Sequence, residues 1–411
     1  MAIRLPLLEA LKANDKFMDG LNNAFDWLFL RESLVKSGKT PYDVIYEQAP
    51  MSLRFYPTPP KANIELSDRS LKPVETRCRK TPIILVPPLG VTSETFDLMP
   101  HRSLARFMSA SGYYTYMVDW GKPSKEHAHL SLVDYAEEML GNVKKQVQAH
   151  SGSEEVSMMG WCMGGLLILL HAGFTRDPNI KNIITVASPI DLRGGGIVAK
   201  SATALDAPAR LVRKYSSWRL HELSPKLLAS PKWMTTLGFK LTDPIGSITT
   251  YWDLLTRLWD REFVENHSTT SDYLNNMLLY PGGVIQDMIV NAAVDNQFAK
   301  GKMNIRGKEA DLSSIKADML VYAGDRDVLV PAPVARKLME VVSSKDKEFH
   351  VSPGGHMGVV LGSGAQGNVW QPAADWLASR SGGVPKQRPE TPAEKSIAKA
   401  KRRAGADDFI Y

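Results

Sequence analysis

One short stretch in the middle of the chain constrains its fold more than any other. An apolar-leaning segment beginning at Val156 runs into Gly160-Trp-Cys-Met-Gly-Gly165, and the apolar run Leu166–Leu170 follows directly. Small residues on both sides of such a turn let a strand turn sharply into a helix without side-chain collisions. The pattern Gly-x-Cys-x-Gly therefore predicts a nucleophile elbow with Cys162 at its tip. The alternative interpretation is a tight turn that holds a buried, inert cysteine.

The elbow also predicts where a negative charge would be stabilised. A residue at the start of a helix benefits from the helix dipole, which favours a thiolate at Cys162. The next amide, that of Met163, is then a candidate oxyanion donor. The second donor is expected in the Pro/Gly loop after the apolar strand that starts at Thr81, from Leu89 or Gly90.

An elbow nucleophile needs a base to take its proton and an acid to orient that base. Along the chain, the acid follows the nucleophile and the base follows the acid. Asp327 stands three residues after Gly324, the glycine that ends a buried apolar strand. Asp325 is the rival acid, with a structural role in the turn as its other interpretation. His356 lies in a Gly-flanked loop after the last expected strand. The order predicts a triad of Cys162, Asp327 and His356, and no motif predicts a metal site.

The pattern of elements divides the chain. Strands alternate with helices over residues 39–191 and 311–380, which predicts an α/β core with a mostly parallel sheet. Residues 192–310 break this alternation with helix-like, aromatic-rich segments, so we expect an inserted, largely helical cap. Residues 1–38 are expected to form a helical N-terminal segment. Residues 381–411 follow a Gly/Pro-marked linker and are expected to form a basic, flexible tail.

The N-terminal segment carries apolar residues at helical spacing, including Leu21, Phe25, Leu28 and Leu30. We expect them to pack on the core, with a contact to a partner as the alternative. Thr40-Pro-Tyr-Asp43 predicts the start of a helix.

The composition of the chain limits the cellular compartment and the kinds of partner that we expect. Two cysteines, Cys78 and Cys162, make no disulfide framework, and Cys78 lies in a polar connector without a base pattern. No signal-peptide pattern or membrane-length apolar run is found, so a cytoplasmic location is expected. The net charge of +6 comes partly from the tail, and nucleic acid is not expected as a partner. Gly194–Ser201 resembles a phosphate-binding loop, but Ala199 replaces its second glycine. We therefore expect Lys200 and Ser201 at the mouth of the cap.

Several stretches together resemble the polyhydroxyalkanoate (PHA) synthases, most closely the catalytic subunit of the two-subunit class, over residues 40–380. The resemblance is carried by Gly160–Gly165, Val118–Gly121, Ser188–Asp191, Asp260–Asn266, Asp327–Pro331 and Gly354–Gly358. The sequence departs from the family at Val328, where a histidine is usual, and at Val91-Thr92, where an Asn-Lys or Asn-Arg pair is usual.

The resemblance implies an α/β-hydrolase fold and an acyltransferase that polymerises (R)-3-hydroxyacyl-CoA through a Cys162 thioester, with release of CoA. No cofactor is expected beyond the coenzyme A of the substrate. The implied partners are a non-catalytic synthase subunit and the polymer granule, and a homo-oligomer is left open. One alternative is a thioester or polyester hydrolase on the same triad. The other is a non-catalytic, granule-associated or partner-binding protein.

Overall fold

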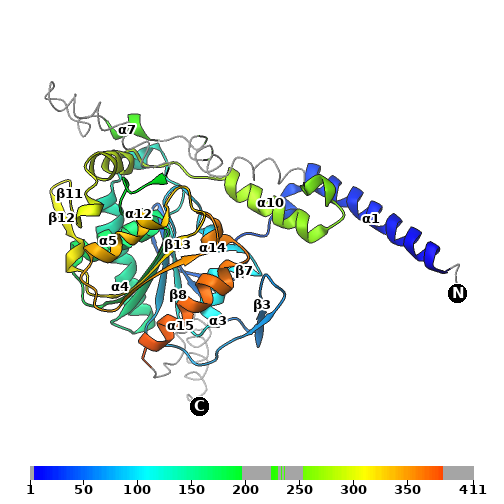
Figure 1. Cartoon of the computed structure of the whole chain (residues 1–411), viewed down its shortest axis with the longest axis horizontal. Coiled ribbons are helices and arrows are strands. Elements are labelled where there is room, and N and C mark those ends of the chain that lie inside the picture. Colours follow the sequence, from blue (N-terminus) through cyan, green and yellow to red (C-terminus); the bar gives the residue numbers. More distant parts are fainter. Residues whose placement is uncertain (1–3, 197–223, 230–232, 234–235, 237–252, 383–411) are drawn as a thin grey trace, which may run out of the picture.

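An eight-stranded sheet forms the centre of the molecule, in the order β1-β2-β8-β5-β9-β10-β13-β14 (Figure 1). The computed structural model describes residues 4–196, 224–229, 233, 236 and 253–382, with side chains from residue 14 onward. The strands are β1 (Asp43–Gln48), β2 (Met51–Tyr56), β5 (Ile83–Val86), β8 (Thr115–Asp119), β9 (Val156–Trp161), β10 (Ile180–Val186), β13 (Asp318–Gly324) and β14 (Lys347–Ser352). β2 pairs antiparallel with β1 and β8, and the remaining pairs are parallel.

Helices cover both faces of this sheet. The side chains of α4 (Leu140–Ser151) and α5 (Met163–Thr175) pack in the core on one face. Those of α3 (Leu104–Ala110) and α15 (Gln371–Arg380) pack on the other. Parallel strands buried on both faces read as continuous apolar runs, and every residue of β5 is fully buried. The apolar strand predicted from Thr81 is confirmed as β5, and the one predicted to end at Gly324 is confirmed as β13.

The helix start predicted at Thr40 is wrong, because β1 begins at Asp43. Thr40 does not cap a helix. Its hydroxyl donates to Asp97 Oδ1 at 2.5 Å and its amide donates to Asp97 Oδ2 at 3.1 Å. The chain leaves this contact extended and forms the outer strand of the sheet.

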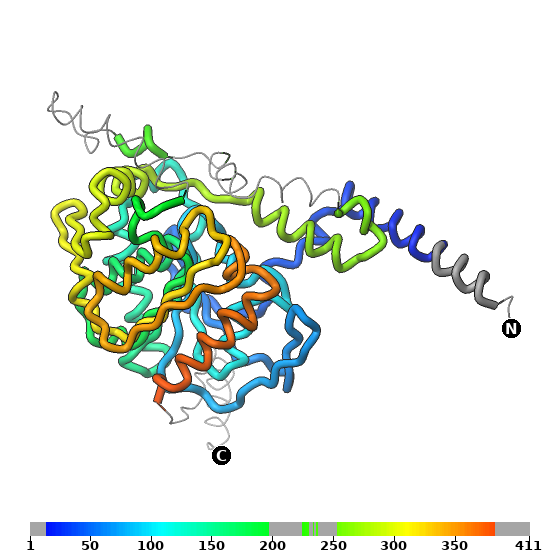
Figure 2. Tube along the Cα trace, in the orientation of Figure 1, coloured from blue at the N-terminus to red at the C-terminus, as the bar shows by residue number. Residues whose placement is uncertain are grey.

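The N-terminal helices project away from the sheet (Figures 1 and 2). α1 (Arg4–Phe29) and α2 (Arg31–Leu34) contact α10 (Arg261–Asn275) instead of the sheet core. Asn23 is buried there and donates to the Leu258 carbonyl at 2.7 Å. The prediction that the apolar side packs on the core is wrong, since all four of its residues are at least half exposed: Leu21, Phe25, Leu28 and Leu30.

The described residues between 192 and 310, which were predicted to form the cap and are called the inserted region below, include several helical segments. After α10 come α11 (Gly282–Asp287), the π-helix η5 (Met288–Val294) and the 3-10 helix η6 (Phe298–Lys300). The hairpin of β11 (Lys302–Ile305) and β12 (Lys308–Asp311) follows. Its apolar residues Met303, Ile305 and Ala310 join the core beside α5.

Smaller elements complete the described chain. They are β3 (Asn63–Glu65), β4 (Leu71–Pro73), η1 (Ser93–Phe96), β6 (Asp97–Met99), β7 (Arg102–Ser103), η2 (Lys125–His129), η3 (Asp134–Met139), α7 (Pro225–Leu228), η7 (Leu312–Ser314), α12 (Ala332–Arg336), α13 (Leu338–Val341), α14 (Gly358–Leu361) and η8 (Gln366–Trp370). Among the described helices, none has both the length and the apolar character needed to cross a membrane. Lys200, Ser201 and the tail from residue 383 onward lie outside the described residues.

Candidate active site

Cys162 occupies the junction between β9 and α5. Its backbone has φ 51° and ψ −120°, a conformation that residues with a side chain rarely adopt. Its amide donates to the Val186 carbonyl of the neighbouring strand β10 at 2.8 Å, which holds the junction in place. Cys162 is partly exposed, in contrast to the buried residues of β9 that precede it. This strand–turn–helix geometry is the one that an elbow requires.

Gly164 shows why the elbow needs small residues. A Cβ atom at this position would lie 2.1 Å from the Val86 carbonyl oxygen at the end of β5. The first turn of α5 can therefore approach the sheet closely only with glycine here. The same closeness brings the start of α5 beside the loop that follows β5.

The predicted acid and base meet at the ends of two adjacent strands. His356 follows β14, and its Nδ1 lies 2.8 Å from Oδ2 of Asp327, which follows β13. Both residues are only 4% exposed. The other oxygen of Asp327 accepts the amides of Leu329 and Val330 at 2.9 and 2.8 Å. The carboxylate is thereby fixed in the orientation that holds the imidazole.

His356 also interacts with Cys162. Burial by itself lowers the pKa of His356, but negative charge at Cys162 and the hydrogen bond to Asp327 outweigh it and raise this pKa to about 10. No nitrogen or oxygen atom among the described residues pairs with Nε2 of His356. Trp161 reaches from β9 and donates its indole N–H to the His356 carbonyl at 3.1 Å. The structure thus brings Cys162, His356 and Asp327 together.

Cys162→Ala is expected to lower the pKa of His356, because it removes a charge that raises this pKa and leaves burial to oppose protonation. Protonated His356 should therefore persist to a higher pH in the wild type than in the variant. By the same sign, the stability that protonated His356 contributes is complete below pH 6.5 and is lost as the pH rises through about 10. Histidine-selective NMR titration of His356 in the two proteins measures this. Identical His356 titrations in both proteins would contradict it.

Asp325, the rival acid, holds a different position. Its Oδ1 accepts the Gly354 amide at 2.8 Å, and this hydrogen bond lowers the pKa of Asp325. The neighbouring Arg326 amide donates to the Gly354 carbonyl at 3.1 Å. Asp325 therefore ties the loop after β13 to the loop that carries His356. Of the two aspartates, Asp327 is the one that contacts the imidazole.

The three predicted oxyanion residues lie in two segments that approach each other, the start of α5 and the loop after β5. Met163 is the first residue of α5, where amides have no partner within the helix. Leu89 and Gly90 are buried in the loop after β5. The Trp120 indole steadies that loop by donating to the Pro87 carbonyl at 2.8 Å. Their role as oxyanion donors stays a prediction.

Two tyrosines that sequence reasoning assigned only to the cap lie near the nucleophile. Burial raises the pKa values of Tyr273 and Tyr280, and negative charge at Cys162 raises both further. The aromatic richness of the cap was the available signal. It did not indicate which aromatic residues approach Cys162.

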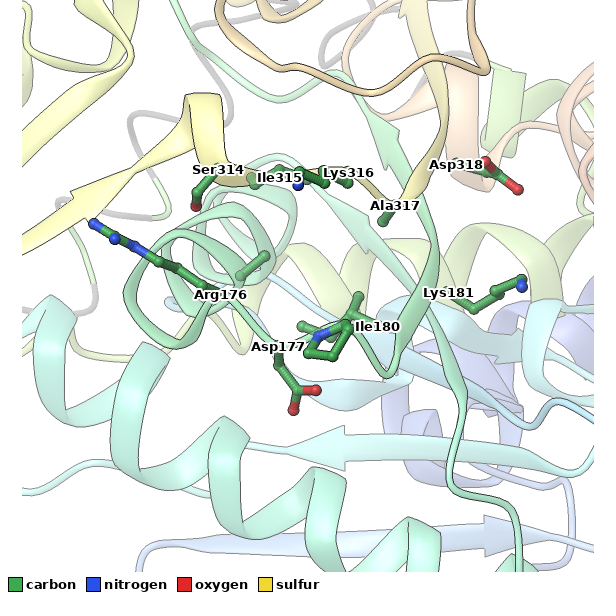
Figure 3. A pocket seen from close by; sticks show the side chains of 11 residues that line it. Arg176, Asp177, Ile180, Lys181, Ser314, Ile315, Lys316, Ala317 and Asp318 are labelled. Carbon is green, nitrogen blue, oxygen red and sulfur yellow. The ribbon is translucent and has the colours of Figure 1, made fainter.

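A pocket of about 640 Å³ lies at the other end of the sheet (Figure 3). It is lined by the first residues of β10 and β13, whereas Cys162 follows the last residue of β9. Asp177 in its wall pairs with Lys144, and Lys181 lies 3.5 Å from Glu155. These charges are already matched, and the pocket contains no triad residue. No group of three metal-ligating side chains occurs within the described residues.

The sheet order, the elbow after β9 and the Asp–His pair after β13 and β14 define an α/β-hydrolase. The family model described as serine aminopeptidase, S33, matches residues 94–357. The chain therefore belongs to this family. The predicted fold class is confirmed.

The chain is also similar to polymerases. It is 25% identical over 370 residues to the poly(3-hydroxyalkanoate) polymerase subunit PhaC of Haloferax mediterranei, covering 89% of this chain and 69% of that protein. It is 22% identical over 380 residues to the subunit of the same name from Thiocystis violacea, covering 91% and 96%. Among solved structures, DcsB in complex with its substrate analogue aligns with a TM-score of 0.48 and 14% identity, covering 84% and 99%. The predicted resemblance to PHA synthases is confirmed by the polymerase relatives.

Proposed function

We propose that this chain is an acyltransferase that polymerises (R)-3-hydroxyacyl-CoA into polyhydroxyalkanoate through a thioester at Cys162, with release of CoA. The observation that carries the proposal is a cysteine at the elbow, beside the buried His356–Asp327 pair. The similarity to polymerase subunits over about nine tenths of the chain supports the choice of substrate.

The chemistry explains why cysteine suits this reaction. Attack of the Cys162 thiolate on an acyl-CoA thioester forms one C–S bond and breaks another, so loading exchanges one thioester for another of similar energy. The CoA sulfur leaves with the proton that His356 took from Cys162. The acyl group stays activated for the next transfer.

The second step makes the ester. His356 removes the proton from the hydroxyl of another 3-hydroxyacyl group, whose oxygen attacks the Cys162 thioester. The C–S bond breaks, and Cys162 takes up the negative charge or the proton. Asp327 keeps Nδ1 of His356 protonated, so Nε2 is the atom that exchanges protons in both steps. The product ester is more stable than the thioester from which it is made.

The competing reaction is hydrolysis on the same triad. The family model carries the description of a hydrolase, and water can take the place of the hydroxyl in the second step. A thioester or polyester hydrolase is therefore the second candidate function. A cap that excludes water favours the polymerase.

Incubation with (R)-3-hydroxybutyryl-CoA separates the two candidates. We expect CoA release to be accompanied by 3-hydroxybutyrate oligomers, because the acyl-enzyme is intercepted by a hydroxyl. Liquid chromatography with mass spectrometry measures CoA, free acid and oligomers in one reaction. CoA release that yields only free 3-hydroxybutyrate would establish the hydrolase instead.

The proposal extends to partners and location. We infer that the chain acts in the cytoplasm with a non-catalytic subunit and at the polymer granule. Support for a partner comes from the relatives, which are named polymerase subunits.

A further inference from the structure

The chain between α10 and α11 is bound to the loop that follows β5. In Figures 1 and 2 this chain runs from α10 back toward the part of the molecule that contains the sheet. The Leu278 amide donates to the Gly90 carbonyl at 2.8 Å. The buried hydroxyls of Tyr273 and Thr95 are hydrogen-bonded to each other. These contacts hold the inserted region directly on the predicted oxyanion loop.

Tyr280 adds the closest contact. A Cβ atom built on Gly90 would lie 2.1 Å from Cε2 and 2.5 Å from Cζ of Tyr280, so the ring rests against the Gly90 backbone. Gly90 also has φ +83°, a conformation that side chains disfavour. Both the backbone conformation and the ring contact therefore require glycine. We call the contacts of Tyr273, Leu278 and Tyr280 with Gly90 and Thr95 the clasp.

The clasp also approaches the nucleophile. Burial and negative charge at Cys162 both raise the pKa of Tyr280, and the same two causes act on Tyr273. The ring of Tyr280 thus contacts the loop after β5 and is close enough to Cys162 to feel its charge.

We propose that Tyr280 is a positioning residue that acts through Gly90. Its ring and the Leu278 hydrogen bond set the Leu89–Gly90 backbone in the position that stabilises the oxyanion. The inserted region thereby makes acylation of Cys162 depend on a closed clasp. The inference deepens the proposed function and rests on its assignment of these residues to the oxyanion site. A misplacement of about 1 Å in such a site costs about 100-fold in rate.

The test compares two reactions of Cys162 in the full chain carrying Tyr280→Ala. Acylation by p-nitrophenyl acetate passes through an oxyanion, whereas alkylation by iodoacetamide does not. We expect the acylation burst to slow by about 10- to 100-fold, since removing one oxyanion donor costs about 100- to 1,000-fold and the loop is displaced rather than deleted. The rate of alkylation should stay near the wild-type rate.

Three further variants sharpen this test. Tyr280→Phe keeps the ring against Gly90 and should restore most of the acylation rate. Gly90→Ala pushes the same ring away from the other side and should reproduce the split between the two reactions. Tyr46→Ala removes an equally half-buried tyrosine on β1, far along the sheet, as the matched control. Circular dichroism and thermal unfolding check the fold of each variant.

Several results would overturn the inference. One is an acylation rate in Tyr280→Ala equal to that of the wild type, and another is an equal slowing of acylation and alkylation. A third is an acylation rate in Tyr280→Phe as low as that in Tyr280→Ala, which would assign the effect to the hydroxyl. An absent wild-type burst would overturn it as well. Because the ester probe needs neither CoA nor a hydroxyl acceptor, failure of polymerisation with (R)-3-hydroxybutyryl-CoA would reject the proposed function while leaving this test readable.

Discussion

Cys162→Ala is expected to abolish CoA release from (R)-3-hydroxybutyryl-CoA, with a loss of about 10⁴-fold or more. Removing the nucleophile of a triad leaves only the binding and oxyanion contributions. The His356–Asp327 pair remains in the variant but has no thiol to activate. Chromatography of released CoA measures the rate. Mass spectrometry of the intact protein should show an acyl adduct on the wild type and none on the variant.

Cys78→Ala provides the matched control, since it removes the other free cysteine, which is likewise partly buried and lies outside the site. Its rate of CoA release should equal that of the wild type. Equal activity of Cys162→Ala and wild type would instead reject catalysis at the elbow. A complete absence of turnover in all three proteins would favour the non-catalytic, partner-binding alternative.

Asp327→Asn is expected to reduce kcat by about 10³- to 10⁴-fold with a much smaller change in KM. The carboxylate now accepts from Nδ1 of His356 at 2.8 Å and fixes the tautomer in which Nε2 can take a proton. An asparagine amide that donates to Nδ1 would favour the opposite tautomer. Steady-state CoA release measures the effect on kcat and KM.

Asp325→Asn is the matched comparison for this carboxylate. The asparagine oxygen can still accept the Gly354 amide, as Asp325 does at 2.8 Å, so the loop geometry and the rate should change little. A larger loss in Asp325→Asn than in Asp327→Asn would reverse the assignment of the acid. The pair thus decides between two aspartates that stand only two positions apart.

The core of the fold could be read from the sequence because its strands are buried on both faces. Continuous apolar runs such as Ile83–Val86 are typical of a parallel strand that is covered by helices on both faces. The elbow was readable for a related reason. Its glycines indicate close backbone contacts, such as that of Gly164 with Val86, because any side chain at these positions would prevent them.

The outer elements were not readable in the same way. β1 lies at the edge of the sheet, and all its residues are half-buried or exposed, so its burial shows no alternation. Thr40 resembled a helix cap, but its partner, Asp97, lies 57 positions away. For the N-terminal segment, periodicity located the apolar residues, but the expected packing of these residues on the core was wrong, because periodicity does not show what covers an apolar side. The approach of Tyr280 to Gly90 is likewise a tertiary contact without a local signal.

The central position of β10 has a consequence for the reaction centre. β9 and β13 do not pair with each other, since β10 lies between them and aligns Val186 with Trp161 on one side and Tyr322 on the other. A slip of one residue on either side would displace the nucleophile from its base by about 3.3 Å and reverse the faces of the strand. β10 supplies none of the three predicted triad residues, but its pairing with β9 and β13 sets the distances between them. Backbone hydrogen bonds between the strands determine the spacing of the triad. Substitutions of side chains on β10 that keep this pairing therefore leave the spacing unchanged.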